Sequence, residues 1–157
     1  MPDTNGQTRT LADYHGKLVV MVFGYTHCPD VCPTTLAEFS QAMQSLGPQK
    51  AARVQVLFVT LDPERDRPAV LAQYAAAFNP SFRALRPATT ARLKALAASF
   101  HIFYAKVPGS NPDNYTMDHT AACLVFDTTG KLRLYVRDGQ GVKPWVHDLG
   151  ELLANDA

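Results

Sequence analysis

An α/β fold, with a mixed central sheet flanked by helices on both faces, is what the sequence predicts. The first indication is an apolar run at 18–23, followed by a helical pattern from 33 to about 46 and a second apolar run at 53–61. Strand, helix and strand in that order imply a right-handed crossover between two parallel strands. The second indication is a pair of apolar runs at 121–127 and 132–136 around a short turn, which is typical of an antiparallel hairpin. A sheet that holds both kinds of pairing is mixed.

The remaining elements follow from the same patterns. Residues 1–16 are polar and rich in turn formers, and Asn5 and Gly6 are expected to form a two-residue hairpin turn. Further along, we expect helices at 69–78 and 89–100, a strand at 101–107, a long polar loop at 108–117 and a last helix at 142–154. The complete order, βαβ, then helices, a hairpin and a final helix, is thioredoxin-like.

Length and composition indicate one globular domain over residues 1–157. The chain is 46% hydrophobic and 18% charged, which is enough apolar material for a core. Its net charge of +1 and the lack of a long basic run argue against nucleic acid as a partner. The sequence contains no apolar stretch of membrane-spanning length. Because Met1-Pro2-Asp3 looks like an arbitrary start, we expect a membrane anchor to precede it in the full-length protein.

Two cysteines mark the turn between the first strand and the first helix. Residues 24–33 read Gly-Tyr-Thr-His-Cys-Pro-Asp-Val-Cys-Pro, which places Cys28 and Cys32 where free N–H groups and the helix dipole favour thiolates. If Pro33 is the first helical residue, Cys32 is the N-cap and the better placed thiol; a capping box at Thr35 and Glu38 would start the helix three residues later. Such a pair can form a disulfide, bind one soft metal ion, or simply be buried.

A charged loop at 62–68 follows the second strand and lies at the same sheet edge as the cysteines. In open α/β sheets, ligands bind at this edge. Asp62 is therefore a candidate site residue, although a purely structural role in the loop is the alternative. Asp66 is expected to cap a helix whose first turn contains Pro68.

Three segments together resemble the Sco/SenC family. They are the cysteine motif at 24–33, the segment Leu-Asp-Pro-Glu-Arg-Asp-Arg-Pro at 61–68 and the tripeptide Asp-His-Thr at 118–120. The resemblance extends from about Asn5 to the last helix. Members of this family are thioredoxin-like proteins that bind copper and help to assemble the binuclear copper A site of cytochrome c oxidase.

The resemblance implies a role for each matching residue. It makes Cys28 and Cys32 the copper-binding thiolates, His119 the distal imidazole ligand and Asp62 a neighbour of the site that does not itself bind the metal. It also implies a place in the bacterial periplasm or, as the alternative, in the mitochondrial intermembrane space. The implied partners are the oxidase subunit that carries copper A and another copper chaperone.

Coordination chemistry agrees with copper. Two thiolates and one imidazole form a soft set of three ligands, which suits Cu(I) and also admits Cu(II), while a structural zinc would be one ligand short unless water completed the set. The rival hypothesis is a thiol–disulfide oxidoreductase that keeps the cysteines of the oxidase copper site reduced, with Cys28 and Cys32 as its catalytic pair. A peroxidase-type thiol enzyme on the same fold is a third alternative, so the sequence leaves open whether the protein is an enzyme.

Other residues with metal-binding side chains have simpler interpretations. His27 adjoins Cys28 and is expected to be a turn histidine, Met117 is expected to fill the core or a loop, and Cys123 is expected to be a buried, inert thiol. No site role is predicted for His15, His101 and His147.

Overall fold

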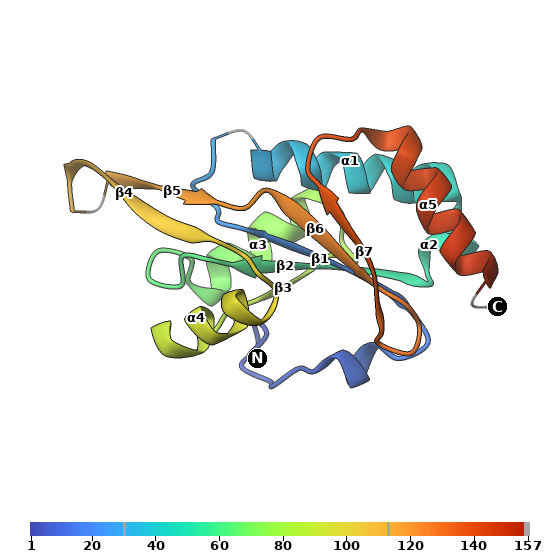
Figure 1. The fold of residues 1–157 in the computed structure, drawn as a ribbon, viewed down its shortest axis with the longest axis horizontal. Coiled ribbons are helices and arrows are strands. Elements are labelled where there is room, and N and C mark those ends of the chain that lie inside the picture. Colours follow the sequence, from blue (N-terminus) through green and yellow to red (C-terminus); the bar gives the residue numbers. More distant parts are fainter. Residues whose placement is uncertain (30, 113, 156–157) are drawn as a thin grey trace.

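The computed structural model describes residues 1–29, 31–112 and 114–155, without the side chains of Val31 and Asn155. Its central sheet has five strands in the order β3-β2-β1-β6-β7 (Figure 1). β1 pairs in parallel with β2, which pairs in parallel with β3, whereas β6 is antiparallel to both β1 and β7. The mixed sheet predicted from the sequence is therefore confirmed. The strand bounds are β1 Leu18–Gly24, β2 Val54–Thr60, β3 Arg83–Leu85, β6 Ala122–Phe126 and β7 Leu132–Arg137.

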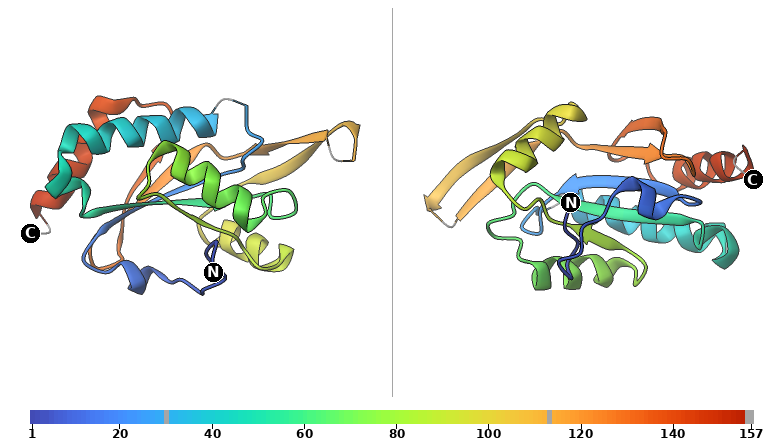
Figure 2. Two further views of the ribbon diagram at one scale, coloured as in Figure 1. Left: turned by 180° about the vertical axis from the view of Figure 1, so that it is seen from behind. Right: turned by 90° about the horizontal axis from the view of Figure 1, so that it is seen from below.

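Helices cover both faces of this sheet, as predicted. Side chains of a strand alternate between its two faces, so a strand covered on both sides is apolar throughout. All seven residues of β1 are buried, and its two faces belong to different core clusters. Leu36, Leu71 and Leu149 pack on one face, and Leu93 and Ala97 pack on the other. The first face is thus covered by α1 Val31–Leu46, α3 Pro68–Phe78 and α5 Val142–Asn155, and the second by α4 Thr90–Ser99 (Figure 2).

The prediction of a loop at 108–117 is wrong, because this segment forms part of a β-hairpin. β4 Tyr104–Asn111 pairs with β5 Asn114–His119 in a separate two-stranded sheet, which extends beyond the end of the central sheet (Figure 1). Tyr115 and Met117 are buried while their neighbours in β5 are exposed, which is the alternation of a half-buried strand. The strand predicted at 101–107 begins only at Tyr104, and the preceding His101 has a positive φ of 58°.

Smaller departures concern the ends of elements. α1 begins at Val31, so both predicted starts, at Pro33 and after Thr35, are wrong; Pro33 lies in the first turn, where its missing N–H breaks no helical bond. α3 begins at Pro68 with Arg67 as its N-cap, so Asp66 is not the cap. The sequence analysis missed strand β3 and two short helices, η1 Leu11–Tyr14 and α2 Pro48–Ala51.

The N-terminal turn lies where it was expected, but it has three residues rather than two, because the Asp3 N–H donates to the Gln7 carbonyl at 2.8 Å around residues 4–6. Asn5 and Gly6 lie between Pro2 and Thr8, which form an isolated antiparallel bridge, and Gly6 has a positive φ of 80°. None of the helices in the described residues combines the length and the apolar character needed to cross a membrane.

Candidate metal centre

The two cysteines lie at the carboxyl end of β1 and the start of α1. Cys32 is 1% exposed and packs in the core, whereas Cys28 is half-buried. The backbone N–H of Cys32 points to Cys28 Sγ at 3.5 Å, so the turn folds the first thiol back over the start of the helix. Neither of the two cysteines is part of a disulfide. The core thus fixes one sulfur, and the other lies at its edge.

His119 brings an imidazole to these sulfurs from the last residue of β5. Its Nε2 lies 3.9 Å from Cys32 Sγ, and its Nδ1 lies 3.0 Å from the carbonyl oxygen of Thr120. A carbonyl only accepts hydrogen bonds, so in the neutral ring Nδ1 carries the proton and Nε2 offers its lone pair to the thiols. The ligand atoms of Cys28, Cys32 and His119 all lie within 4.8 Å of one another. The three predicted ligands are therefore close enough to share one ion.

The surroundings of the site raise the pKa of two of its candidate ligands, Cys32 and His119. A hydrogen bond with Cys28 and burial both raise the pKa of the Cys32 thiol. Burial lowers the pKa of His119, but hydrogen bonds with Cys28 and the Thr120 carbonyl outweigh it, so that pKa is raised. The helix terminus alone would favour a thiolate at Cys32, but the hydrogen bond with Cys28 and burial raise the pKa of this thiol instead. A metal that binds here must displace protons.

Two tyrosines hold the β4–β5 hairpin in place, Tyr25 against the cysteine segment (residues 24–32) and Tyr115 against the 62–68 loop. The Tyr25 hydroxyl accepts a hydrogen bond from the backbone N–H of Met117 at 3.1 Å, and the Tyr25 ring meets His119 edge-on with centroids 6.1 Å apart. The Tyr115 hydroxyl donates to Asp62 at 2.5 Å, and the Arg65 guanidinium stacks over the Tyr115 ring at 3.6 Å. Met117 and Tyr115 precede His119 on the same strand, so these contacts position the imidazole.

Asp62 forms hydrogen bonds with neighbouring residues. Besides the Tyr115 hydroxyl, Arg65 Nε donates to its carboxylate at 2.6 Å, and its own N–H donates to Thr60. Asp62 therefore connects the 62–68 loop to the hairpin.

Asp66 fastens the same loop to the cysteine segment. Its side chain is fully buried and accepts hydrogen bonds from the Thr26 N–H at 3.0 Å, the Thr26 hydroxyl at 2.5 Å and the Thr60 hydroxyl at 2.7 Å. His27, Asp62 and Asp66 also offer ligand atoms within 4.8 Å of one another. Both carboxylates of this second group are already occupied, and His27 is exposed with its Nδ1 4.0 Å from Asp66. We assign the group a structural role.

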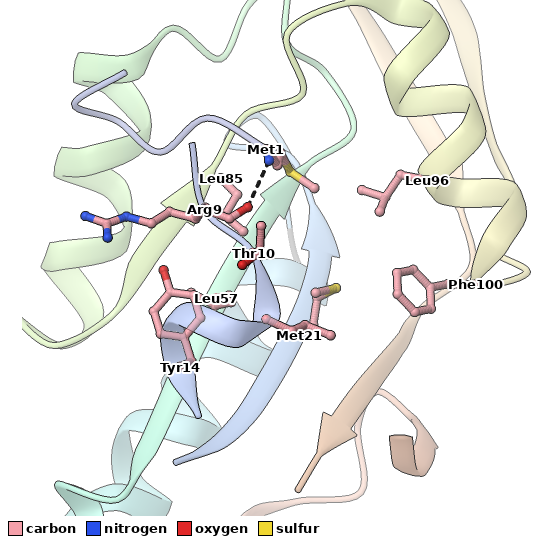
Figure 3. A pocket seen from close by; sticks show the side chains of 10 residues that line it. Met1, Arg9, Thr10, Tyr14, Met21, Leu57, Leu85, Leu96 and Phe100 are labelled. Atoms are coloured by element: carbon pink, nitrogen blue, oxygen red, sulfur yellow. Dashed lines mark hydrogen bonds between the residues drawn. The ribbon is translucent and has the colours of Figure 1, made fainter. Parts of the chain in front are cut away.

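An open cavity of about 360 Å³ adjoins the candidate ligands, so the site can be reached from solvent. Its wall is formed by both the cysteine segment and the hairpin, namely by Tyr25, Cys28, Pro29, Thr116, Met117, Asp118, His119 and Ala121. A second pocket, of about 270 Å³, lies between the N-terminal segment, the sheet and α4 (Figure 3). Its lining is mainly apolar and includes Met21, Leu57, Leu96 and Phe100, without a thiol or an imidazole.

The remaining predicted residues lie outside the ligand set. Met117 is buried, as expected of a filler. Cys123 is fully buried, and its thiol donates to Asp138 at 3.0 Å. The sequence analysis missed the contributions of Tyr115 and Asp138. Neither belongs to a recognisable motif, and only the pairing of strands brings them near the cysteines.

Comparison with known proteins identifies related sequences. The SCO1/SenC family model matches residues 1–154. A SCO2-like protein of Rickettsia felis is 36% identical over 130 residues, and the mouse mitochondrial SCO2 homolog is 34% identical over 129. Each match covers 82% of this chain, but only 62% and 50% of the respective relative, so the chain spans about half to three fifths of their length.

Solved structures agree with these matches. The structure of Bradyrhizobium japonicum ScoI with copper bound superposes with a TM-score of 0.84 at 35% identity, covering 96% of this chain and 94% of that one. Yeast Sco1 with copper bound gives a TM-score of 0.86 at 28% identity, covering 97% and 84%. Apo Sco1 of Thermus thermophilus gives 0.80 at 40% identity, covering 90% and 83%. The thioredoxin-like fold predicted from the sequence is confirmed.

Proposed function

Because the SCO1/SenC model matches it over residues 1–154, this chain belongs to the SCO1/SenC family, and we propose that it carries copper for assembly of the copper A site of cytochrome c oxidase. In this role copper is a cargo held by Cys28, Cys32 and His119. The observation that carries the proposal is that two thiol sulfurs and one imidazole nitrogen lie within 4.8 Å of one another beside an open cavity.

The chemistry of this donor set fits copper. Thiolate and imidazole are the ligands that Cu(I) prefers, and three of them satisfy it without a fourth. Cu(II) can use the same atoms with water in addition. Zinc in a structural site takes four protein ligands, and only three belong to this group among the described residues.

The geometry also suits a carrier that must release its cargo. Cys32 is held in the core, whereas Cys28 and His119 line the cavity, where an incoming ligand of a partner can approach. Copper would then exchange its ligands one at a time, and its bonds to Cys28 and His119 would be replaced before its bond to Cys32. Movement of the hairpin that carries His119 would open the site further.

Asp62 would act through the hairpin. By accepting the Tyr115 hydrogen bond, it holds β5 in the position from which His119 reaches the thiols. We therefore propose that Asp62 positions the imidazole ligand without binding copper. Asp62→Asn would weaken copper binding less than loss of a ligand does.

The partners would be the oxidase subunit that receives copper A and a second chaperone that supplies copper. The mouse relative is a SCO2 homolog of mitochondria, whereas ScoI of Bradyrhizobium japonicum is bacterial. We place the protein in the bacterial periplasm, attached to the membrane by a preceding segment, with the mitochondrial intermembrane space as the alternative. Nucleic acid is not proposed as a partner.

A second function, thiol–disulfide exchange, is favoured by the unequal exposure of the cysteines. Half-buried Cys28 could attack a disulfide of the oxidase subunit, and Cys32 behind it could resolve the mixed disulfide. Each cycle would leave the target reduced and Cys28–Cys32 oxidised, and an external thiol reductant would have to restore the pair. This reaction would prepare the target cysteines to receive copper.

Copper titration of the fully reduced protein against a competing Cu(I) chelator tests the carrier proposal. We expect one tightly held copper per chain, and a loss of affinity of more than about 100-fold in each of Cys28→Ser, Cys32→Ser and His119→Ala, because even residues that only support ligands contribute 10–100-fold. His27→Ala is the matched control and should bind as the wild type does. Binding that ignores His119 would overturn the proposal and favour thiol–disulfide exchange.

A further inference from the structure

Asp138 is an acidic residue beside the metal centre that the proposed mechanism does not use. It follows β7, and its backbone N–H donates to the carbonyl of Ala121 at 2.9 Å. Its carboxylate accepts hydrogen bonds from the Cys123 thiol at 3.0 Å and from the Thr35 hydroxyl. These contacts fix the half-buried carboxylate between α1 and the start of β6.

The same contacts place Asp138 close to the three candidate ligands. Thr35 lies one turn after Cys32 on α1, and Ala121 lies two residues after His119 on the wall of the cavity. Asp138 interacts electrostatically with Cys28, Cys32 and His119. Within the described part of the chain, no lysine or arginine forms an ion pair with it. Burial raises the pKa of Asp138, while the hydrogen bonds from Cys123 and Thr35 favour the ionised carboxylate, which acts on the metal centre through these electrostatic interactions.

The charge of the site changes differently with the two oxidation states of copper. Two thiols release two protons when they bind a metal, and the imidazole remains neutral. With Cu(I), the site therefore gains one net negative charge, because two positive charges leave and one arrives. With Cu(II), two positive charges leave and two arrive, so the net charge is unchanged.

We propose that Asp138 lowers the affinity of the Cys28, Cys32 and His119 site for Cu(I) relative to Cu(II). The inference rests on the proposed copper-carrier function. A fixed carboxylate repels the extra negative charge of the Cu(I) form and has little net effect on the Cu(II) form. Asp138 thereby brings the affinities for the two ions closer together and makes Cu(I) easier to release. Cys123 and Thr35 hold the carboxylate in place, which gives the third cysteine a role outside the ligand set.

Competition titrations of Asp138→Asn with Cu(I) and Cu(II), at pH 8, test the inference. The asparagine keeps the shape of the side chain and an acceptor for Cys123, but removes the charge. We expect the affinity for Cu(I) to rise about tenfold and the affinity for Cu(II) to stay within about twofold. Glu151→Gln, which removes an exposed carboxylate from the C-terminal half of α5, is the matched control and should change neither affinity. An equal change for both ions, or no change, would overturn the inference.

Two additions separate this test from that of the proposed function. Asp138→Ser supplies a second neutral variant, should the asparagine disturb folding. Titration with Ag(I) and Zn(II) applies the same charge rule at the same thiols without copper, and only Ag(I) binding should strengthen in the neutral variants. A wild-type protein that fails to hold copper would contradict the carrier function, whereas unaltered Ag(I) binding in both variants would contradict the role of Asp138.

Discussion

The cysteine segment (residues 24–32) and the hairpin (β4 and β5) supply the same site from very different surroundings. The cysteine segment continues β1, a fully buried strand that pairs with both β2 and β6, and Cys32 lies within the core. The hairpin forms its own two-stranded sheet, and six of the eight residues of β4 are exposed. Only a few side chains of the hairpin, chiefly Tyr115 and Met117, enter the core.

This difference indicates how a tight site can also release its cargo. Regions with few buried contacts open locally at low cost, whereas regions within the core open only when the whole domain unfolds. The sulfur of Cys32 therefore stays in place while His119 can leave with its hairpin. We expect substitutions in the cysteine segment to reduce global stability and substitutions at the hairpin to alter metal exchange.

Removing the Asp66 carboxylate, which holds the cysteine segment in place, should cause the largest loss of stability. Asp66→Ala leaves the Thr26 N–H and the Thr26 and Thr60 hydroxyls without their acceptor in a fully buried place. We expect a loss of about 3 kcal/mol in the free energy of unfolding, measured by urea denaturation. Asp118→Ala, which removes an exposed carboxylate from the hairpin, should change that free energy by less than about 0.5 kcal/mol. Equal losses in the two variants would refute the contrast between the regions.

Gly24 sets the space available to the buried thiol. A Cβ atom at this position would collide with Cys32 Sγ and would lie 3.0 Å from Phe58 Cε2. Gly24→Ala should therefore destabilise the protein by about 2 kcal/mol and displace a copper ligand, which lowers copper affinity as well. Urea denaturation and chelator competition measure the two effects.

Gly150 provides the control for this substitution. A Cβ atom there would meet only Leu46 Cδ2, at an ordinary contact distance of 3.9 Å. Gly150→Ala in the middle of α5 should thus stabilise the protein by about 0.5–1 kcal/mol. If both substitutions changed the free energy of unfolding in the same direction, the close packing of Gly24 against Cys32 would not explain the result.

The sequence predicted the cysteine segment better than the hairpin for a physical reason. β1 and β2 are buried on both faces, so their apolar runs are continuous and easily recognised. In the hairpin, only Tyr115 and Met117 alternate with polar residues, and Pro108 and Gly109 made the segment resemble a loop.

The candidate ligands differ in the same way. Cys28 and Cys32 are linked by a local motif, but 87 positions separate Cys32 from His119, and only the family resemblance connected them before the fold was known. The hydrogen bond with Cys28 and burial raise the pKa of the Cys32 thiol, and the burial depends on packing between distant elements. No local sequence pattern indicates this burial.

Removing one hydroxyl by which the cysteine segment contacts the hairpin should produce the smallest and most local effect, because the only hydrogen bond lost among the described residues is the one to Met117 of β5. In Tyr25→Phe, the Met117 N–H loses its acceptor, while the ring that meets His119 remains. We expect a cost of about 1 kcal/mol, confined to the opening of the hairpin. Amide hydrogen exchange at Met117 should therefore become about five times faster, and copper should transfer faster to a chelator, while the urea midpoint hardly moves. Tyr135→Phe, at an exposed tyrosine of β7, is the control and should leave all three unchanged. Faster unfolding of the whole domain in Tyr25→Phe would mean that the hairpin and the cysteine segment open together, and release of the cargo would then require more than movement of the hairpin.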